Sequence, residues 1–201
     1  MVEKQINTTD AQDLLEQYIP MFKSLKENNI KYCLVGGIAV MAHALANNYD
    51  KFRATVDADL VLPKNYSNFD FAKTYVSTYS KSNEENKIIA QALVGDEDLN
   101  KLNDKELKFS NLTFIGAQKN LDGIDTPDFD VCRIINGYTI DEIKTETIEI
   151  GDVDIVVASI DNLIEMKKRT IKLYGADPET NPRFQDFIDL KILKDLKNKE
   201  K

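Results

Sequence analysis

Two aspartates separated by one residue form the segment of the sequence best suited to chemistry. Asp57 and Asp59 lie in residues 55–62, where polar and apolar side chains alternate as in a half-buried β-strand. Four apolar side chains then share one face of the strand: Val56, Ala58, Leu60 and Leu62. The two carboxylates lie together on the other face, where they repel each other unless a cation lies between them. Mg²⁺ prefers carboxylate oxygens together with substrate phosphates, so the spacing predicts a metal site. An isolated Asp-x-Asp pair is, however, more often two solvated side chains.

A pair of glycines lies about twenty residues upstream of these aspartates. Residues 32–35 are apolar and predict a strand, Gly36 and Gly37 follow, and residues 38–46 predict an alanine-rich helix. Glycine lets the backbone approach a ligand closely, and a helix N-terminus presents unpaired N–H groups to an anion. A phosphate bound at this turn would lie near metal ions held on a neighbouring strand. The simpler interpretation is a tight strand-to-helix turn.

Together these two segments resemble the nucleotidyltransferase superfamily with the DNA polymerase β-like fold. Residues 35–40 and 53–60 resemble the Gly-Gly turn, the Arg-x-Thr lead-in and the Asp-x-Asp strand of a small bacterial branch. This branch includes the AbiEii-type toxins of type IV toxin–antitoxin systems. Residues 161–167 and 183–190 are similar to its Leu-Ile-x-x-Lys and Arg-x-x-Asp-x-x-Asp-Leu helices, and the match covers about residues 30–62 and 129–193.

The resemblance implies a third carboxylate on a nearby strand. We favour Asp130, because its predicted strand follows the long middle segment, as the strand of the family's third acid does. Asp154 is the alternative, although it follows a predicted hairpin turn, where surface aspartates are common. The implied metal is Mg²⁺, with Mn²⁺ as an alternative, held by Asp57, Asp59 and one of these two residues.

The resemblance also implies residues that bind the nucleotide. The candidates are Gly36, Gly37, Arg53, Thr55, Lys167 and Asp186. Lys167 could pair with a phosphate as a point charge, or it could be an exposed helical lysine.

The elements that must position these residues are helices at both ends of the chain with strands between them. Helices are predicted over residues 8–27, with N-cap oxygens at 8–10 and a break at Pro20, and over residues 69–79. Strands are predicted at 111–115 and 129–135, and as a hairpin at 147–150 and 153–157 that turns through Gly151-Asp152. Ser159 caps the next helix, Asn181-Pro182 begins the last one, and the polar residues 81–110 predict helix or loop.

This order predicts an α+β fold with a mixed central sheet flanked by helices and with C-terminal helices. The resemblance makes it a single nucleotidyltransferase domain over residues 1–201. We place its core at about 30–158 and its C-terminal helical part at about 159–197.

The composition and charge of the chain indicate its cellular compartment and its classes of partner. The chain has 201 residues and a net charge of −8, which opposes non-specific binding to nucleic acid. Its N-terminal residues 1–5 form no apolar signal-peptide core, and no run of apolar residues approaches the length of a membrane span, so we expect a cytoplasmic protein with no membrane partner. Cys33 and Cys132 lie in apolar runs and are expected to be buried thiols.

The expected activity is the transfer of a nucleoside monophosphate from a nucleoside triphosphate to a hydroxyl acceptor. The acceptor could be tRNA, a protein or a small molecule, and an antitoxin protein is a candidate partner if the chain is a toxin. One alternative is an antibiotic-modifying nucleotidyltransferase. Another is a non-catalytic module that binds a nucleotide or a partner through a vestigial site.

Overall fold

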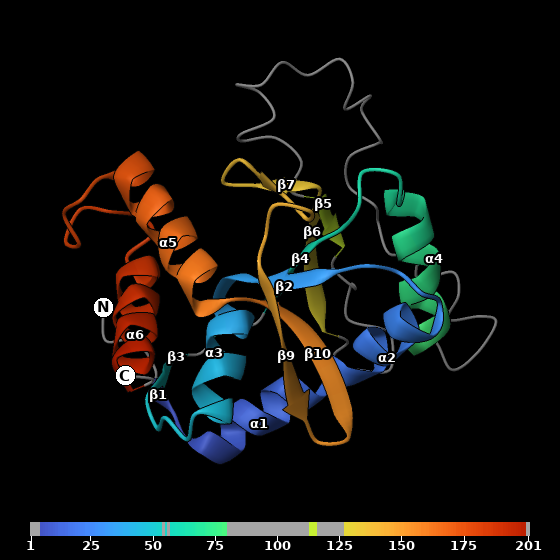
Figure 1. Ribbon diagram of the computed structural model, residues 1–201, viewed down its shortest axis with the longest axis horizontal. Coiled ribbons are helices and arrows are strands. Elements are labelled where there is room, and N and C mark those ends of the chain that lie inside the picture. The colour runs from blue at the N-terminus through green and yellow to red at the C-terminus, as the bar shows by residue number, and fades with distance from the viewer. Residues whose placement is uncertain (1–4, 54, 56, 80–112, 116–126, 200–201) are drawn as a thin grey trace, which may run out of the picture.

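A mixed six-stranded sheet forms the centre of the molecule in the computed structural model, which describes residues 5–53, 55, 57–79, 113–115 and 127–199 (Figure 1). The strands, in their order across the sheet, are β5 (Thr113–Ile115), β6 (Asp128–Cys132), β4 (Asp57–Val61), β2 (Cys33–Val35), β10 (Val153–Ala158) and β9 (Thr145–Ile150). The pairs β6–β4 and β2–β10 are parallel, and the other neighbours are antiparallel. The predicted mixed sheet is therefore confirmed.

Helices flank this sheet, and two of them follow it in the chain. They are α1 (Thr8–Glu16), α2 (Ile19–Glu27), α3 (Gly36–Ala46), α4 (Asn68–Tyr79), α5 (Ile160–Tyr174) and α6 (Gln185–Lys199). The last two lie side by side at the left of Figure 1, next to α3 and away from α4. This arrangement confirms the predicted α+β class with C-terminal helices.

One face of β4 and β6 is buried by aromatic side chains. The ring of Phe129 on β6 lies between 5.2 and 6.4 Å from four other rings. These rings belong to Tyr18, Phe22, Phe71 and Tyr75. Such packing contributes to the core beyond its buried area. Because side chains alternate along a strand, the aspartates of β4 and β6 must lie on the opposite face.

Two hairpins have two-residue turns. Residues Gly151-Asp152 join β9 to β10, and only Gly151 has positive φ, at 62°, as the predicted type II′ turn requires. The second hairpin joins β7 (Ile134–Ile135) to β8 (Tyr138–Thr139) through Asn136-Gly137. Both residues of this turn have positive φ, 50° and 83°, as in a type I′ turn. The single strand predicted at 129–135 is wrong, because it is divided between β6 and β7.

Several predicted helix ends differ from the structure. Pro20 separates α1 from α2 as expected, but the N-cap of α1 is Asn7, whose side chain accepts from the Asp10 amide. The last helix begins at Gln185 rather than at Asn181-Pro182. The Asn181 side chain accepts instead from the Arg183 amide at 2.7 Å, which closes a turn before the helix starts. The expectation for residues 81–110 lies outside the described residues.

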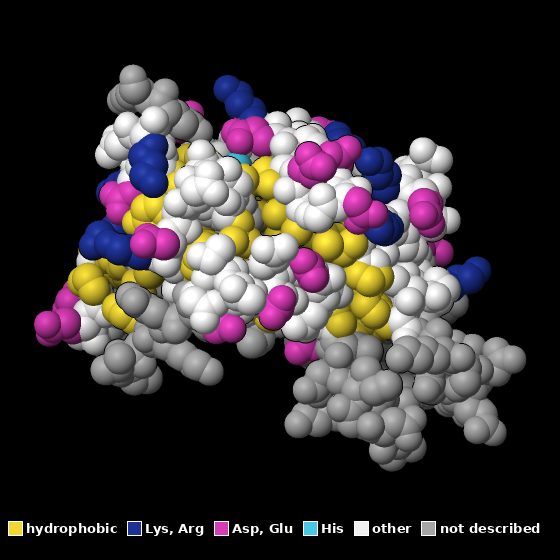
Figure 2. All heavy atoms as spheres, turned by 90° about the horizontal axis from the view of Figure 1, so that it is seen from below, with side chains coloured by type: hydrophobic (Ala, Val, Ile, Leu, Met, Phe, Trp, Pro, Cys, Tyr) yellow, Lys and Arg dark blue, Asp and Glu magenta, His cyan; other side chains and the backbone are white. Residues whose placement is uncertain are grey.

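Acidic side chains are spread across the face of the molecule shown in Figure 2, while Lys and Arg lie nearer its margins. This distribution agrees with the net charge of −8. Both cysteines are buried free thiols, as predicted. Of the helices in the described ranges, none combines the length and the apolar character needed to cross a bilayer.

Candidate metal and nucleotide site

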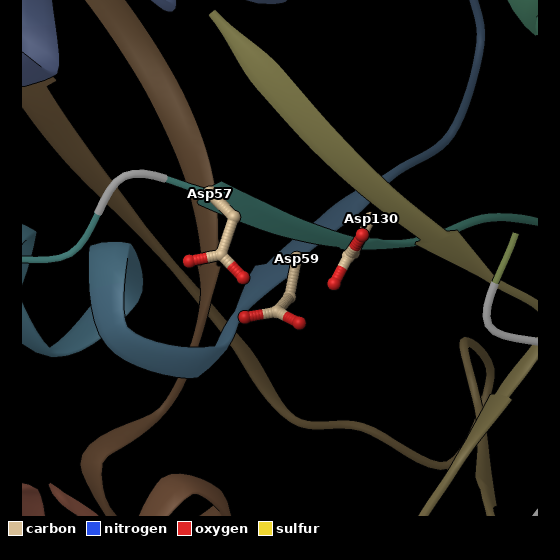
Figure 3. Close-up of side chains that lie close together, drawn as sticks. All are labelled: Asp57, Asp59 and Asp130. Atoms are coloured by element: carbon tan, nitrogen blue, oxygen red, sulfur yellow. The ribbon is translucent and has the colours of Figure 1, made fainter. Parts of the chain in front are cut away.

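Three carboxylates meet on the open face of the sheet (Figure 3). Asp57 and Asp59 belong to β4, and Asp130 lies opposite Asp59 on the parallel neighbour β6. Each residue offers an oxygen within 4.8 Å of the others, and all three side chains are partly exposed. Two oxygens bound to one Mg²⁺ lie at most about 4.2 Å apart, so small side-chain rotations would bring this set into range. The cluster therefore fits a divalent cation.

The carboxylates of this cluster destabilise each other's charges. Burial and the neighbouring Asp57 raise the pKa of Asp59 to about 7, against the opposing influence of Lys167. Burial and the same neighbour raise the pKa of Asp130 to about 6. Negative charge concentrated in a partly dehydrated site favours either proton uptake or the binding of a cation.

The turn at Gly36 and Gly37 leaves room for the side chains of Asp59, Arg53 and Thr55. Gly36 has a φ of 69°, and a Cβ atom at this position would lie 1.7 Å from Oδ2 of Asp59. A Cβ atom on Gly37 would lie 2.4 Å from Nη2 of Arg53 and 3.0 Å from Oγ1 of Thr55. Position 36 therefore requires glycine, whereas a side chain at Gly37 would displace the end of the Arg53 side chain and crowd Thr55. The same turn begins α3, whose N-cap residue makes no side-chain capping bond, so its first amides remain suited to an anion.

Thr55 and Arg53 link the turn to the metal-binding residues and to the C-terminal helices. The Thr55 hydroxyl donates to Oδ1 of Asp57 at 3.0 Å, which orients one carboxylate of the triad. Arg53 lies on β3 (Phe52–Arg53), a short strand that pairs with β1 (Gln5–Ile6). Its guanidinium donates from Nε and Nη2 to the two oxygens of Asp189 on α6, at 2.9 and 3.0 Å.

A buried network of ion pairs joins α5 to α6 beside the triad. Lys167 donates to Asp186 at 2.6 Å and lies 2.7 Å from Oδ2 of Asp189. Arg183 pairs with the second oxygen of Asp186 at 3.2 Å, and its side chain is 48% exposed. With Arg53, three cations contact the carboxylates of Asp186 and Asp189 next to the acidic triad. Lys167 is thus a buried ion-pair partner and not an exposed helical lysine.

These ion pairs outweigh the cost of burial. Burial alone would lower the pKa of Lys167, but Asp189 and Asp186 raise it above its usual value. Burial would likewise raise the pKa of Asp189, yet Lys167 and Arg53 hold it below its usual value. Lys167 and Asp189 therefore stay charged at neutral pH.

One cavity of about 270 Å³ brings the triad, the glycine turn and most of the ion-pair network together. The nine predicted site residues line it: Gly36, Gly37, Arg53, Thr55, Asp57, Asp59, Asp130, Lys167 and Asp186. Arg183 lines it as well, and Asp189 lies behind it, bonded to Arg53 and Lys167. The alternative third acid, Asp154, lies elsewhere, paired with Lys26 at 3.3 Å on the surface.

Sequence reasoning did not assign a role to Arg183 or Asp189. Both lie in the segment 183–190 whose spacing resembles the family's Arg-x-x-Asp-x-x-Asp-Leu helix, so a signal for them existed. Asp189 is 1% exposed and Arg183 reaches the same ion-pair network. The contacts of Asp189 with β3 and α5 depend on tertiary packing, which spacing alone does not specify.

Comparison with known proteins identifies the fold. The sequence matches no protein-family model and no curated protein. Among solved structures, the chain is similar to the crystal structure of an antigenic nucleotidyltransferase-like protein from Paracoccidioides brasiliensis. The TM-score is 0.51 at 11% sequence identity, and the alignment covers 94% of this chain and 78% of that one. At this identity the likeness concerns the fold, and the relation to the AbiEii-type branch stays a prediction. The chain therefore has a nucleotidyltransferase-like fold with an acidic triad that could hold a metal ion.

Proposed function

We propose that this protein is a metal-dependent nucleotidyltransferase. It transfers a nucleoside monophosphate from a nucleoside triphosphate to a hydroxyl group of an acceptor. One observation carries the proposal: three carboxylates meet beside a helix N-terminus whose two glycines admit close approach. A metal site next to an anion site is the arrangement that a magnesium–triphosphate complex requires.

Each group around the cavity has a role in this proposal. Asp57, Asp59 and Asp130 hold Mg²⁺, which when bound neutralises phosphate charge and favours an in-line displacement. The amides at Gly36 and Gly37 receive the triphosphate. Arg183 supplies the exposed positive charge, because its side chain is about half exposed whereas that of Arg53 is largely buried.

The reaction forms one phosphorus–oxygen bond and breaks another. The acceptor oxygen attacks the α-phosphorus, and the bond from that phosphorus to the oxygen bridging to the β-phosphate breaks. Pyrophosphate leaves, and the proton of the acceptor hydroxyl passes to a carboxylate of the triad, acting as general base. In this scheme Lys167 and Asp186 act on the nucleotide indirectly, because their contacts hold Arg183 and α6 at the edge of the cavity.

Nucleotide binding is tested by calorimetry with ATP, GTP, CTP and UTP in the presence of Mg²⁺. We expect the wild-type protein to bind at least one of them, and the double variant Asp57→Ala/Asp59→Ala to bind none. Asp154→Asn is a matched control, because it removes a carboxylate of the same sheet that lies outside the triad. If the wild-type protein binds no nucleotide in the presence of either Mg²⁺ or Mn²⁺, the proposal fails.

Transfer is tested separately with α-³²P-labelled nucleotides and three classes of acceptor. Label on tRNA or on a protein would fit a toxin of the AbiEii type, whose antitoxin would then be a protein partner. Label on an aminoglycoside or a lincosamide would indicate an antibiotic-modifying enzyme. Nucleotide binding without transfer of label in any of these mixtures would support the non-catalytic alternative.

A further inference from the structure

The cavity has two chemically different ends. The charged end holds the acidic triad and the buried cations described above. The other end lies between the β7–β8 hairpin and α5, and its wall is largely apolar. Its apolar lining comprises Ile134, Ile135, Leu163, Met166, Leu173 and Tyr174. A ligand with a charged part and an uncharged flat part would match both ends at once.

The mouth of this apolar end carries two unusual side chains. Among the described residues, Leu173 and Tyr174 are the large hydrophobic side chains that remain exposed, at 50% and 49%. Both line the cavity, as the last two residues of α5. Exposed apolar groups that gather at one cavity mark a binding surface, and an aromatic ring offers a face for stacking.

The opposite wall is held in place against α5. The guanidinium of Arg169 donates to the Asn136 carbonyl at 2.9 Å and lies 4.4 Å from the centre of the Tyr138 ring. Asn136 is the first residue of the type I′ turn, so these contacts fix the hairpin as a unit. A wall that is already fixed costs little ordering entropy when a ligand enters.

Polar groups at this end have hydrogen-bonding capacity to spare. The Asn136 side chain donates to Thr170 Oγ1 at 3.3 Å and to the Met166 carbonyl at 3.4 Å. Its Oδ1 atom accepts from Thr170 at 3.5 Å. These three bonds of the Asn136 side chain are longer than the usual 2.7–3.2 Å, so a ligand could replace them at low cost. The Thr170 hydroxyl donates to the Met166 carbonyl at 3.1 Å, which leaves its oxygen to act as an acceptor. An amide beside a hydroxyl presents both donors and acceptors, as the edge of a nucleobase does.

We propose that this end of the cavity binds the nucleobase of the donor nucleotide. Tyr174 stacks on the face of the base, and Asn136 and Thr170 meet its edge. The assignment rests on the proposed function, because the charged end then receives the triphosphate of the same molecule. The continuity of the cavity favours the donor base over a separate ligand.

The experiment compares nucleoside triphosphates with inorganic tripolyphosphate. Binding of each, with Mg²⁺ and without an acceptor, is measured calorimetrically for wild-type protein, Tyr174→Ala and Tyr174→Phe. The nucleotides are α,β-methylene analogues, in which transfer is blocked. Stacking on an aromatic side chain contributes about 1–3 kcal/mol per base, so we expect Tyr174→Ala to weaken nucleotide binding about tenfold. Tripolyphosphate should bind Tyr174→Ala as it binds the wild type, and Tyr174→Phe should retain nucleotide affinity.

Lys172→Ala is the matched control, because this exposed residue lies at the same end of α5 but does not line the cavity. Equal nucleotide affinity of Tyr174→Ala and the wild type would overturn the nucleobase assignment while leaving the proposed function intact. Failure of both nucleotide and tripolyphosphate to bind the wild type would instead refute the proposed function.

Discussion

At the scale of single residues, the site depends on what is absent from Gly36 as much as on the carboxylates themselves. Its φ is positive, and Oδ2 of Asp59 lies only 1.7 Å from the position that a Cβ atom would occupy, so there is no room for a side chain. The residue type and backbone conformation at Gly36 therefore determine where the Asp59 carboxylate can lie.

Replacing Gly36 with alanine should abolish metal and nucleotide binding. The new methyl group would displace the Asp59 carboxylate, and the left-handed backbone conformation would cost about 1–2 kcal/mol. Binding is measured by calorimetry and stability by urea unfolding. Gly151→Ala is the control, because Gly151 has a similar φ of 62° but its Cβ would meet its nearest atom at 3.9 Å. It should lose similar stability yet bind normally, and normal binding by Gly36→Ala would contradict the site geometry.

Metal binding should become tighter as the pH rises from about 5.5 to 8. The pKa of Asp59 is about 7 and that of Asp130 about 6, so protons compete with the metal over this range. Binding at pH 6 should release protons, which calorimetry detects by comparing buffers with different ionisation enthalpies. An affinity for Mn²⁺ or Mg²⁺ that stays constant over this range would show that the triad is not the binding site.

The same pKa shifts have an effect on stability with the opposite sign. Both folded-state values lie above the ordinary 3.8, so the metal-free folded protein binds more protons than the unfolded chain between about pH 4 and 7. The contribution of these two groups to the free energy of unfolding therefore decreases as the pH rises through that range. Asp59→Asn should reduce this pH dependence, which provides a check without any metal present.

At the scale of elements, the ion-pair network fixes the relative position of β3, α5 and α6. Asp189 on α6 bonds Arg53 of β3 and Lys167 of α5, and its side chain is 2% exposed. Replacing Asp189 with asparagine would leave two largely buried cations with one fewer negative partner. Breaking such a buried pair costs about 3–5 kcal/mol, so we expect a large fall in the urea midpoint.

The control for Asp189→Asn is Glu165→Gln, which breaks an exposed pair with Arg169 on α5. Exposed pairs of this spacing contribute about 0.3–0.5 kcal/mol, so the change should be small. If both variants lose the same stability, the buried network does not anchor the C-terminal helices.

The elements also show which features could be predicted from sequence. The alternation of polar and apolar residues predicted that Asp57 and Asp59 lie on one face of a strand. The Gly151-Asp152 turn was predictable because its conformation depends on the turn residues themselves. Asn136-Gly137 carries an equally local hairpin signal, and the prediction of one strand through 129–135 overlooked it. The two-residue strand β3 has no such signal, because its conformation depends on pairing with β1.

At the scale of the whole molecule, the cavity lies between the sheet and the C-terminal helices, so one ligand would contact both. The predicted core at about 30–158 and the helical part at about 159–197 share the buried Arg53–Asp189 pair and packing of α3 against α5 and α6. Residue spacing indicated each half separately, whereas the contacts between them required the folded chain. This shared interior favours one cooperative unit over two independent ones.

We therefore expect the chain to unfold in a single transition, with circular dichroism and calorimetry giving the same midpoint. A ligand that binds only the folded state, at a hundred times its dissociation constant, stabilises by about 2.7 kcal/mol. For a protein of this size, 1 kcal/mol shifts the midpoint by about 2–4 °C, so magnesium and a bound nucleotide should raise it by roughly 5–10 °C. The triad belongs to the sheet, whereas the C-terminal part contributes Lys167, Arg183 and Asp186. The ligand should therefore raise the midpoint of the whole unfolding transition. Two transitions, of which the ligand shifts one, would show that the helical part folds independently of the sheet that carries the aspartates.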